Sequence, residues 1–222
     1  MLNEQKGNMY GFVTHTWNAI KGKCPHDCEY CYMKVFPQGE LRFDEKELKT
    51  DLGKGNYIFV GSSCDMFAKE VNDGWITKVI KHCLKYPNNT YLFQTKNPAR
   101  FFVFKSLLEK LPMLILATTI ETNRQEELDK ICKAPKITDR QYYLGQVDFA
   151  DRMVTIEPIM DFDLEVLVNW LKDIDPHFVN IGADSKGHHL PEPSKEKILK
   201  LVEELNKFTE IKKKENLGRL LK

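Results

Sequence analysis

The chain has 222 residues, and its 33 Lys and Arg residues nearly balance its 32 Asp and Glu residues, for a formal net charge of +1. This balance gives no strongly basic surface for extended nucleic acid, and no apolar run is long enough to span a bilayer. Without an apolar signal region or a Pro-, Gly- or Ser-rich linker, the sequence predicts one cytoplasmic domain over residues 1–222, with a C-terminal tail from about residue 209.

Short apolar segments alternate along the chain with longer amphipathic ones, a pattern typical of parallel strands joined by helices. The predicted strands are Gly11–Trp17, Tyr57–Val60, Tyr91–Gln94, Leu114–Thr119, Met153–Ile156 and Phe178–Ile181. The predicted helices, which follow the second to sixth strands, are Trp75–Lys85, Ala99–Leu111, Gln125–Lys133, Leu164–Lys172 and Ser194–Phe208. Between Lys133 and Met153 the pattern is weak, and irregular structure is expected there.

Six consecutive units of this kind predict an α/β fold, a partial (β/α)6 TIM-like barrel, because a closed barrel has eight. The loops that leave the carboxyl ends of parallel strands meet at the barrel mouth, where chemistry gathers. Polar residues follow the predicted strands at this end, namely Asp65, Lys96, Glu121, Asn123, Glu157 and Asp184. We expect these side chains to face a common cavity.

Three cysteines, Cys24, Cys28 and Cys31, stand in the run Cys-Pro-His-Asp-Cys-Glu-Tyr-Cys. Cys thiolates are the usual protein ligands of a [4Fe–4S] cluster, and three of them leave one iron without a protein ligand. A protein that only transfers electrons would normally supply a fourth Cys, so the open iron indicates that a small molecule coordinates there.

Other interpretations of the cysteines stay open. Zinc could be bound with His26 or His15 as the fourth ligand, although structural zinc usually takes its ligands as two separated pairs. A disulfide is disfavoured because the other cysteines, Cys64, Cys83 and Cys132, are scattered and follow no secretory signal. Cys64 follows the second predicted strand, which places it either near the cysteine loop or in the core.

The Cx3Cx2C spacing, with Tyr30 just before the last Cys, resembles the signature of the radical S-adenosylmethionine (SAM) superfamily. The resemblance implies a [4Fe–4S] cluster and SAM as cofactors. In that superfamily the open iron chelates the amino and carboxylate groups of SAM, and reduction gives a 5′-deoxyadenosyl radical. It also implies the partial-barrel fold and an electron donor such as flavodoxin or ferredoxin.

Further motifs, which together cover most of the chain, resemble the radical SAM family first named from the phage proteins Gp37 and Gp68. The motifs are Thr16-Trp17-Asn18, Cys31-Tyr32, Val60-Gly61-Ser62-Ser63, Gln94-Thr95-Lys96-Asn97-Pro98 with Arg100, Thr118-Thr119-Ile120-Glu121-Thr122-Asn123, and Ile156-Glu157-Pro158. The cysteine motif is specific, whereas each of the others is weak alone.

The resemblance implies where SAM is bound. The backbone around Tyr30 and Tyr32 is expected near the adenine. The segment after the second strand takes the place of the superfamily's Gly-Gly-Glu motif, which binds the methionine amino group. This chain lacks the glutamate, so the expected contacts there are Gly61, Ser62, Ser63 and Asp65.

The ribose hydroxyls of SAM are expected to contact Thr118, Glu121 and Asn123 after the fourth strand, because a carboxylate accepts hydrogen bonds and an amide both donates and accepts them. Glu121 has an alternative interpretation in the first turn of the following helix, where negative charge is favourable.

For the substrate, Lys96 and Arg100 form a candidate phosphate clamp, and Trp17 is an expected substrate contact. Glu157 and Asp184 are expected to bind a guanine-like base edge or an ammonium group and to serve in catalysis. A proton donor at the mouth is expected among His15, His188 and His189, with His188 as the candidate catalytic residue. Each of these side chains could instead have a structural role or be exposed.

The resemblance, taken with the size and charge of the chain, implies a radical SAM enzyme acting on a small nucleoside or nucleotide. Among proteins of similar size and motif, the chain most resembles a salvage lyase that releases queuine from queuosine or its 5′-phosphate, and this is the specific hypothesis. Two alternatives stay open: radical modification or repair of DNA or RNA, and a non-enzymatic metal-binding or redox-sensing module.

Overall fold

The computed structural model describes residues 1–5 and 9–222. Its centre is an eight-stranded sheet in the order β1-β2-β5-β6-β7-β8-β9-β10. At one edge β1 (Asn3–Glu4) pairs antiparallel with β2 (His15–Trp17), and all later neighbours pair in parallel. The parallel strands after β2 are β5 (Tyr57–Val60), β6 (Thr90–Gln94), β7 (Leu114–Thr119), β8 (Asp151–Ile156), β9 (Phe178–Ile181) and β10 (Glu210–Lys213).

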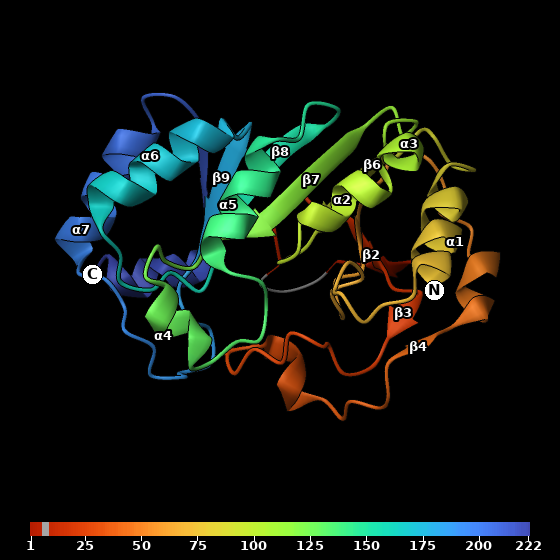
Figure 1. Cartoon of the computed structure of the whole chain (residues 1–222), viewed down its shortest axis with the longest axis horizontal. Helices are drawn as coiled ribbons and strands as arrows, with labels where there is room; N and C mark the ends of the chain where they lie inside the picture. The colour runs from red at the N-terminus through yellow and green to blue at the C-terminus, as the bar shows by residue number, and fades with distance from the viewer. Residues whose placement is uncertain (6–8) are drawn as a thin grey trace.

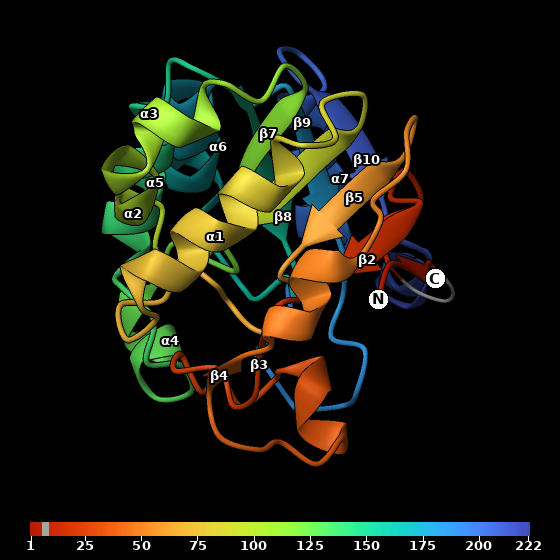
Figure 2. The same ribbon diagram turned by 90° about the vertical axis from the view of Figure 1, so that its right-hand side faces the viewer.

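The sheet curves without closing, since β1 and β10 do not pair with each other (Figures 1 and 2). Helices pack along its outer face: α1 (Asp73–Cys83), α2 (Ala99–Val103), α3 (Lys105–Leu108), α5 (Ile137–Gly145), α6 (Leu164–Ile174) and α7 (Lys195–Leu205). This open arc confirms the predicted partial barrel.

Alternating side chains divide each strand between two apolar layers, as the period of two in a strand requires. On β5, Ile58 and Val60 join the large core beneath the helices, whereas Phe59 joins a smaller cluster on the inner face. Tyr10 and Val13, which precede β2, also belong to the inner cluster. Residues 9–13 therefore fill part of the barrel interior.

A long excursion between β2 and β5 carries the cysteine loop. It contains the two-stranded sheet of β3 (Ile20–Lys21) and β4 (Arg42–Phe43) and the 3-10 helices η1 (Tyr32–Val35) and η2 (Glu45–Lys49). In Figure 1 this excursion lies below the sheet, on the same side as α4 (Gln125–Asp129). It therefore lies across the end of the barrel at which the parallel strands terminate.

Several features differ from the sequence prediction. The first predicted strand, Gly11–Trp17, is shorter in the structure, where β2 begins at His15, and the helix predicted over Gln125–Lys133 ends at Asp129 in α4. The stretch between Lys133 and Met153, expected to be irregular, contains α5. The predicted helix Ala99–Leu111 is divided at Phe104 into α2 and α3. The expected tail after residue 209 instead forms β10, which completes the sheet, and the 3-10 helix η3 (Glu215–Leu220). Within the described part of the chain, no helix has the length and apolar character to cross a membrane.

Candidate functional site

A cavity of about 560 Å³ opens at the carboxyl ends of the parallel strands. Its walls come from the cysteine loop, the turns after β5 and β6, the Glu157-Pro158 segment after β8, the loop after β9 and Lys214 after β10. Tyr10 and Phe59 of the inner apolar cluster also line it. Six separate segments thus converge on one space, as the barrel geometry predicts.

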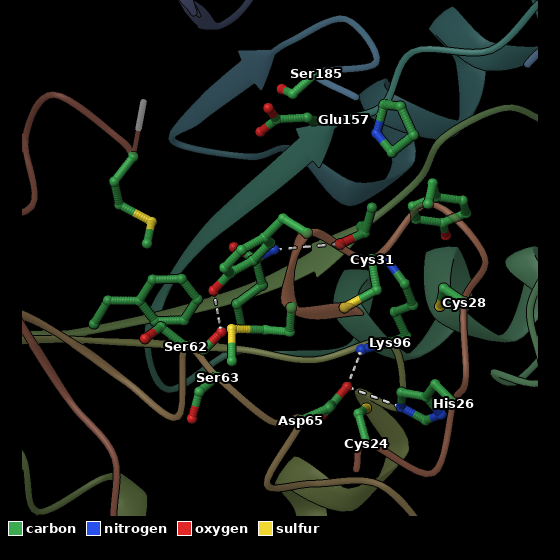
Figure 3. A pocket seen from close by; sticks show the side chains of 18 of the residues that line it. Cys24, His26, Cys28, Cys31, Ser62, Ser63, Asp65, Lys96, Glu157 and Ser185 are labelled. Atoms are coloured by element: carbon green, nitrogen blue, oxygen red, sulfur yellow. Dashed lines mark hydrogen bonds and ion pairs between the residues drawn. The ribbon is translucent and has the colours of Figure 1, made fainter. Parts of the chain in front are cut away.

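All three motif cysteines, Cys24, Cys28 and Cys31, line this cavity (Figure 3). The loop between them turns tightly, because Asp27 N–H donates to the Cys24 carbonyl at 3.1 Å and Cys31 N–H donates to the Cys28 carbonyl at 3.2 Å. Asp27 has a φ of 47°, in the left-handed region that Asp tolerates better than most residues. The loop therefore folds its thiols toward one side.

A contact between His26 and Asp65 anchors the cysteine loop to the barrel. His26 is buried, and its Nε2 lies 2.9 Å from Asp65 Oδ2 in the turn after β5. Asp65 also accepts hydrogen bonds from the hydroxyl of Thr95 at 2.9 Å and from the backbone N–H groups of Lys96 at 2.8 Å and Phe67 at 3.0 Å. Burial alone would raise the pKa of Asp65, but His26 and the hydrogen bonds from Lys96 and Thr95 hold it below its usual range. Asp65 is a fully engaged anchor.

The thiols of the loop also meet cysteines from elsewhere in the chain. The Cys24 and Cys64 thiols hydrogen-bond to each other, and so do those of Cys28 and Cys132. The hydrogen bond from Cys64 lowers the pKa of the Cys24 thiol to about 7, and burial raises the pKa of Cys31.

The donor set fits an iron–sulfur cluster. Each thiolate of a cubane ligates a different iron, so its ligands surround the cluster and need not converge on one ion. Among the described residues no three His, Cys, Asp or Glu side chains converge on a single ion position. Cys24, Cys28 and Cys31 instead lie along the wall of a cavity large enough for a cluster and a small molecule.

Behind the cysteine loop lies a buried charge cluster centred on Glu121, which is fully buried. Lys96 Nζ lies 2.8 Å from Glu121 Oε1, Arg140 Nη1 lies 2.9 Å from Oε2, and the Tyr30 hydroxyl donates a further hydrogen bond to Oε1. Burial alone would raise the pKa of Glu121, but Lys96 and Arg140 lower it to about 2. The cluster ties the cysteine loop, through Tyr30, to the ends of β6 and β7 and to α5.

The turn after β5 is shaped by Gly61, whose φ of 79° favours glycine. A Cβ at this position would lie 3.2 Å from the Met66 side chain, a close contact. Asn18 Oδ1 accepts from Ser63 N–H at 2.9 Å, and the Tyr32 hydroxyl donates to the Ser62 carbonyl at 2.5 Å. These bonds present Gly61, Ser62 and Ser63 to the cavity beside the cysteines.

Glu157 and Ser185 lie at the other end of the cavity, across from Cys24, His26 and Asp65 (Figure 3). The Glu157 carboxylate is held by Lys214, whose Nζ lies 2.9 Å from Oε1 and 3.0 Å from Oε2. A Cβ at Gly182 would lie 2.8 Å from Glu157 Cδ, so this glycine leaves room for the carboxylate.

The loop after β9 is fixed by the C-terminal segment. Asn216 Nδ2 donates to the Ala183 carbonyl and to Ser185 Oγ, both at 2.7 Å. Arg219 pairs with Glu192 and donates to the Asp184 carbonyl at 2.8 Å. Asn216 and Arg219 thereby hold in place the β9 loop, whose residues Ala183, Asp184 and Ser185 line the cavity.

The amino-acid sequence matches the family model described as "Protein of unknown function (DUF5131)" over residues 35–195, most of the chain. The chain belongs to the DUF5131 family. The matched range begins after the cysteine loop and includes Lys96, Glu121, Glu157 and Asp184. No curated protein gives a significant sequence match.

Solved structures share the fold of this DUF5131 protein at low sequence identity. A spore photoproduct lyase mutant aligns with a TM-score of 0.65 at 10% identity, covering 94% of this chain and 80% of the lyase. SuiB of Streptococcus suis bound to S-adenosylmethionine aligns with a TM-score of 0.65 at 8% identity, covering 89% of this chain and 49% of SuiB. A spore photoproduct lyase mutant with bound AdoMet and dinucleoside spore photoproduct gives a TM-score of 0.58 at 11% identity, covering 93% of this chain and 66% of that one.

These likenesses confirm the fold class, the partial TIM barrel of radical SAM enzymes. The family that the chain matches is DUF5131, whereas the sequence motifs suggested the Gp37/Gp68-like family. Membership of the Gp37/Gp68-like family stays a prediction. Many of the predicted site residues line the one cavity: Cys24, Cys28, Cys31, Tyr30, Tyr32, Gly61, Ser62, Ser63, Asp65, Lys96, Glu157 and Asp184.

The expected ribose contacts lie outside the cavity lining. Thr118 is fully buried and donates to the Thr95 carbonyl at 2.7 Å, while Glu121 is enclosed in its charge cluster. Asn123 accepts from Asp163 N–H at 2.8 Å, just before α6. Strand polarity could not distinguish these positions from Thr119, the neighbour of Thr118 that does line the cavity.

Two expected substrate contacts also lie elsewhere. Trp17 is fully buried, and its indole N–H donates to Glu47 at 3.2 Å. Arg100 turns to the segment before α1, where it donates to the carbonyls of Ala68 and Val71 and pairs with Asp73. Neither side chain lines the cavity, so the phosphate clamp expected from Lys96 and Arg100 is not formed in this structure.

The candidate proton donor His188 is also outside the cavity lining. Its Nδ1 lies 2.6 Å from Asp184 Oδ1, and its ring supports the carboxylate from behind. Burial alone would raise the pKa of Asp184, but the hydrogen bonds from His188 and from the N–H groups of Lys186 and His188 lower it.

Several cavity residues were not expected from the sequence. Tyr10 donates to Gln94 Oε1 at 2.8 Å, and both line the cavity together with Lys186 and Lys214. Lys214 is the last of three consecutive lysines, and such a run near a terminus resembles a solvated tail. The local sequence therefore gives little indication that Lys214 faces a cavity. Its partner Glu157 is remote in the sequence.

Proposed function

We propose that this protein is a radical SAM enzyme acting on a nucleoside or nucleotide. A [4Fe–4S] cluster bound by Cys24, Cys28 and Cys31 would supply the electron that cleaves SAM to a 5′-deoxyadenosyl radical. The observation that carries the proposal is the placement of these three thiols in a cavity at the carboxyl ends of parallel strands, opposite a second set of charged side chains. Resident cluster, SAM and substrate then share one space.

The residues beside the cysteines are suited to bind SAM. Ser62 and Ser63 present hydroxyl groups to the methionine part, whereas Asp65 is occupied by its four hydrogen bonds. Gln94 and Thr119 both line the cavity, and Gln94 Nε2 donates to Thr119 Oγ1 at 3.3 Å. Their side chains offer donors and acceptors to the ribose in place of the buried Thr118.

The far end of the cavity is suited to the substrate. Glu157 and Asp184 present carboxylates that accept hydrogen bonds from a base edge or an ammonium group. Lys214 and Lys186, which line the same end, supply the positive charge for a phosphate that Lys96 and Arg100 do not offer. This end therefore suits a ligand that carries both hydrogen-bond donors and an anionic group.

The finer proposal is a lyase that releases queuine from queuosine or queuosine 5′-phosphate. The adenosyl radical would remove a hydrogen atom from the substrate ribose, and collapse of the sugar radical would expel the base. In this arrangement Glu157 or Asp184 holds the base edge, and Lys214 orients the phosphate. The electron would come from a flavodoxin or ferredoxin.

The test uses purified, anaerobically reconstituted protein with SAM and a chemical reductant. Queuosine 5′-phosphate should increase the formation of 5′-deoxyadenosine and release queuine, whereas guanosine 5′-phosphate should not. Cys28→Ala should remove both products. Equal formation of 5′-deoxyadenosine with and without queuosine nucleotides, and no released base, would exclude the lyase.

A second candidate is radical chemistry on DNA or RNA. It is favoured by the fold likeness to spore photoproduct lyase, which was solved with a bound dinucleoside spore photoproduct. The balanced charge of the chain disfavours extended contacts with phosphate. Oligonucleotide binding that weakens steeply with added salt would support this candidate over the single-nucleotide substrate.

A further inference from the structure

Two thiols of the cysteine loop are paired with cysteines outside the motif. Cys24 is hydrogen-bonded to Cys64 in the turn after β5, and Cys28 is hydrogen-bonded to Cys132 after α4. Cluster binding by the motif assigns no role to Cys64 or Cys132. Both are buried, so a packing role would satisfy them, but packing alone does not explain why each one meets a ligand of the proposed cluster.

The backbone holds the second pair together from both sides. Glu29 N–H donates to the Ile131 carbonyl at 2.8 Å, and Lys133 N–H donates to the His26 carbonyl at 2.8 Å. Cys132 lies between Ile131 and Lys133, and Cys28 lies between His26 and Glu29. The two hydrogen bonds thus bracket the pair and fix its main chains side by side, whatever the side-chain rotamers.

The first pair is held by the anchor between His26 and Asp65, whose side chains lie 2.9 Å apart. Asp65 follows Cys64 directly, and its backbone N–H also hydrogen-bonds to the Cys24 sulfur. The turn after β5 therefore cannot move away from Cys24 without breaking both contacts. Cys24 and Cys64 both line the cavity, where a small oxidant can reach them.

The remaining cysteines differ. For Cys31 and Cys83, the described residues provide no hydrogen-bonded thiol partner. Cys83 is fully buried at the end of α1, away from the cavity. The six cysteines thus divide into two pairs and two single thiols.

We propose that Cys24–Cys64 and Cys28–Cys132 are two sites of reversible oxidation, which close as disulfides when the loop carries no cluster. The role we assign to these disulfides, protection of two cluster-ligand thiols, depends on the proposed cluster. The pairs would keep two ligand thiols in a reducible form, instead of leaving them to oxidise irreversibly.

The oxidant we propose is a peroxide. It oxidises the Cys24 thiolate to a sulfenic acid and is reduced to water. The Cys64 thiol then attacks this sulfur, so that the S–S bond forms and a second water leaves. Each disulfide removes two electrons from its pair, and a dithiol reductant returns them with two protons. The same balance applies to Cys28, which lines the cavity, and Cys132: peroxide oxidises one sulfur of the pair, and the other thiol attacks it to form the S–S bond with loss of water.

The experiment uses the full chain, freed of cluster, reduced and then treated with limiting hydrogen peroxide. Alkylation in denaturant should show a fall from six reactive thiols to two, and peptide mapping should link Cys24 to Cys64 and Cys28 to Cys132. Dithiothreitol should restore all six thiols and the iron uptake of the untreated protein. Links within the motif, links between chains, or six unchanged thiols would overturn the proposal.

Single substitutions test the pairs separately. Cys64→Ser and Cys132→Ser each leave one sulfenic acid without its partner, so peroxide should carry Cys24 or Cys28 on to a sulfinic acid that dithiothreitol does not reduce. Cys83→Ala is the matched control and should form both disulfides. If one serine variant fails to fold, the other still tests its own pair.

The outcome is independent of catalysis, because the mapping requires neither SAM nor substrate. If the disulfides Cys24–Cys64 and Cys28–Cys132 form in a protein that never cleaves SAM, the proposed function is excluded and the proposed oxidation sites are supported. An active enzyme without these links would overturn only the oxidation sites.

Discussion

Lys214 and Glu157 form an ion pair at the substrate end of the cavity, with Lys214 Nζ 2.9 Å from Glu157 Oε1. The two residues come from different parts of the chain: Glu157 follows β8, and Lys214 follows β10. The Glu157 side chain is only 18% exposed and the Lys214 side chain only 9%, so solvent screens the pair weakly. The C-terminal segment, which resembles a solvated tail in the sequence, is therefore part of the site.

Replacing Lys214 with Met leaves the largely buried Glu157 carboxylate without its ion-pair partner. We expect the free energy of unfolding to fall by roughly 1–3 kcal/mol, the usual cost of an unsatisfied buried polar group. Urea denaturation of Lys214→Met measures this. The exposed neighbour provides the control, and Lys213→Met should change stability by less than about 0.5 kcal/mol. Equal effects of the two substitutions would show that the ion pair contributes nothing.

The charge cluster around Glu121 predicts a larger effect. Glu121→Gln leaves Lys96 and Arg140 buried without a carboxylate, and removing one partner of a buried ion pair costs roughly 3–5 kcal/mol. Guanidinium denaturation should show this loss, whereas Glu126→Gln on the exposed face of α4 should behave as the unmodified protein. A loss below about 1 kcal/mol would be typical of a surface pair and would contradict the structural role of the cluster.

The same cluster predicts how stability depends on pH. The pKa of Glu121 is about 2 in the folded protein, below its ordinary value of 4.5, so the folded state holds the carboxylate ionised more strongly than the unfolded state does. Its contribution is fully present above pH 4.5 and is lost as the pH falls toward 2. Unfolding free energies measured across this range should fall less steeply in Glu121→Gln. Identical slopes would show that other carboxylates dominate.

Arg100 tests the division between substrate binding and structure. Because its guanidinium donates to carbonyls of the segment before α1, Arg100→Met should lower the free energy of unfolding by roughly 1–3 kcal/mol. The concentration of queuosine 5′-phosphate that half-maximally stimulates 5′-deoxyadenosine formation should stay unchanged, as it should in the exposed control Lys110→Met. A large rise in that concentration at full stability would return Arg100 to the substrate site.

Much of the framework could be predicted from local sequence. β5, β7 and β9 have the predicted bounds because each lies in a short, continuous apolar run. The cysteine loop was predictable because its ligands are contiguous. Residues just beyond strands, such as Glu157 and Asp184, followed from the rule that these ends meet.

The remaining features depend on contacts between distant residues. The buried residues of α5 include Arg140. Its charge is stable there because it pairs with Glu121, which follows β7. A charged residue on the buried face breaks the amphipathic pattern, so the helix was not predicted. β10 is an edge strand in which the lysines lie partly over aromatic rings, with Lys212 Nζ 4.6 Å from the Phe178 ring centre. Its composition alone indicates a solvated tail.

The central claim is tested most directly by electron paramagnetic resonance of the anaerobically reconstituted and reduced protein, recorded with and without SAM. We predict the spectrum of a reduced [4Fe–4S] cluster that changes when SAM is added, and its loss in Cys28→Ala. Zinc in place of iron, or a cluster spectrum that SAM leaves unchanged, would contradict an open iron in this cavity and leave a metal-binding or redox-sensing module as the remaining account.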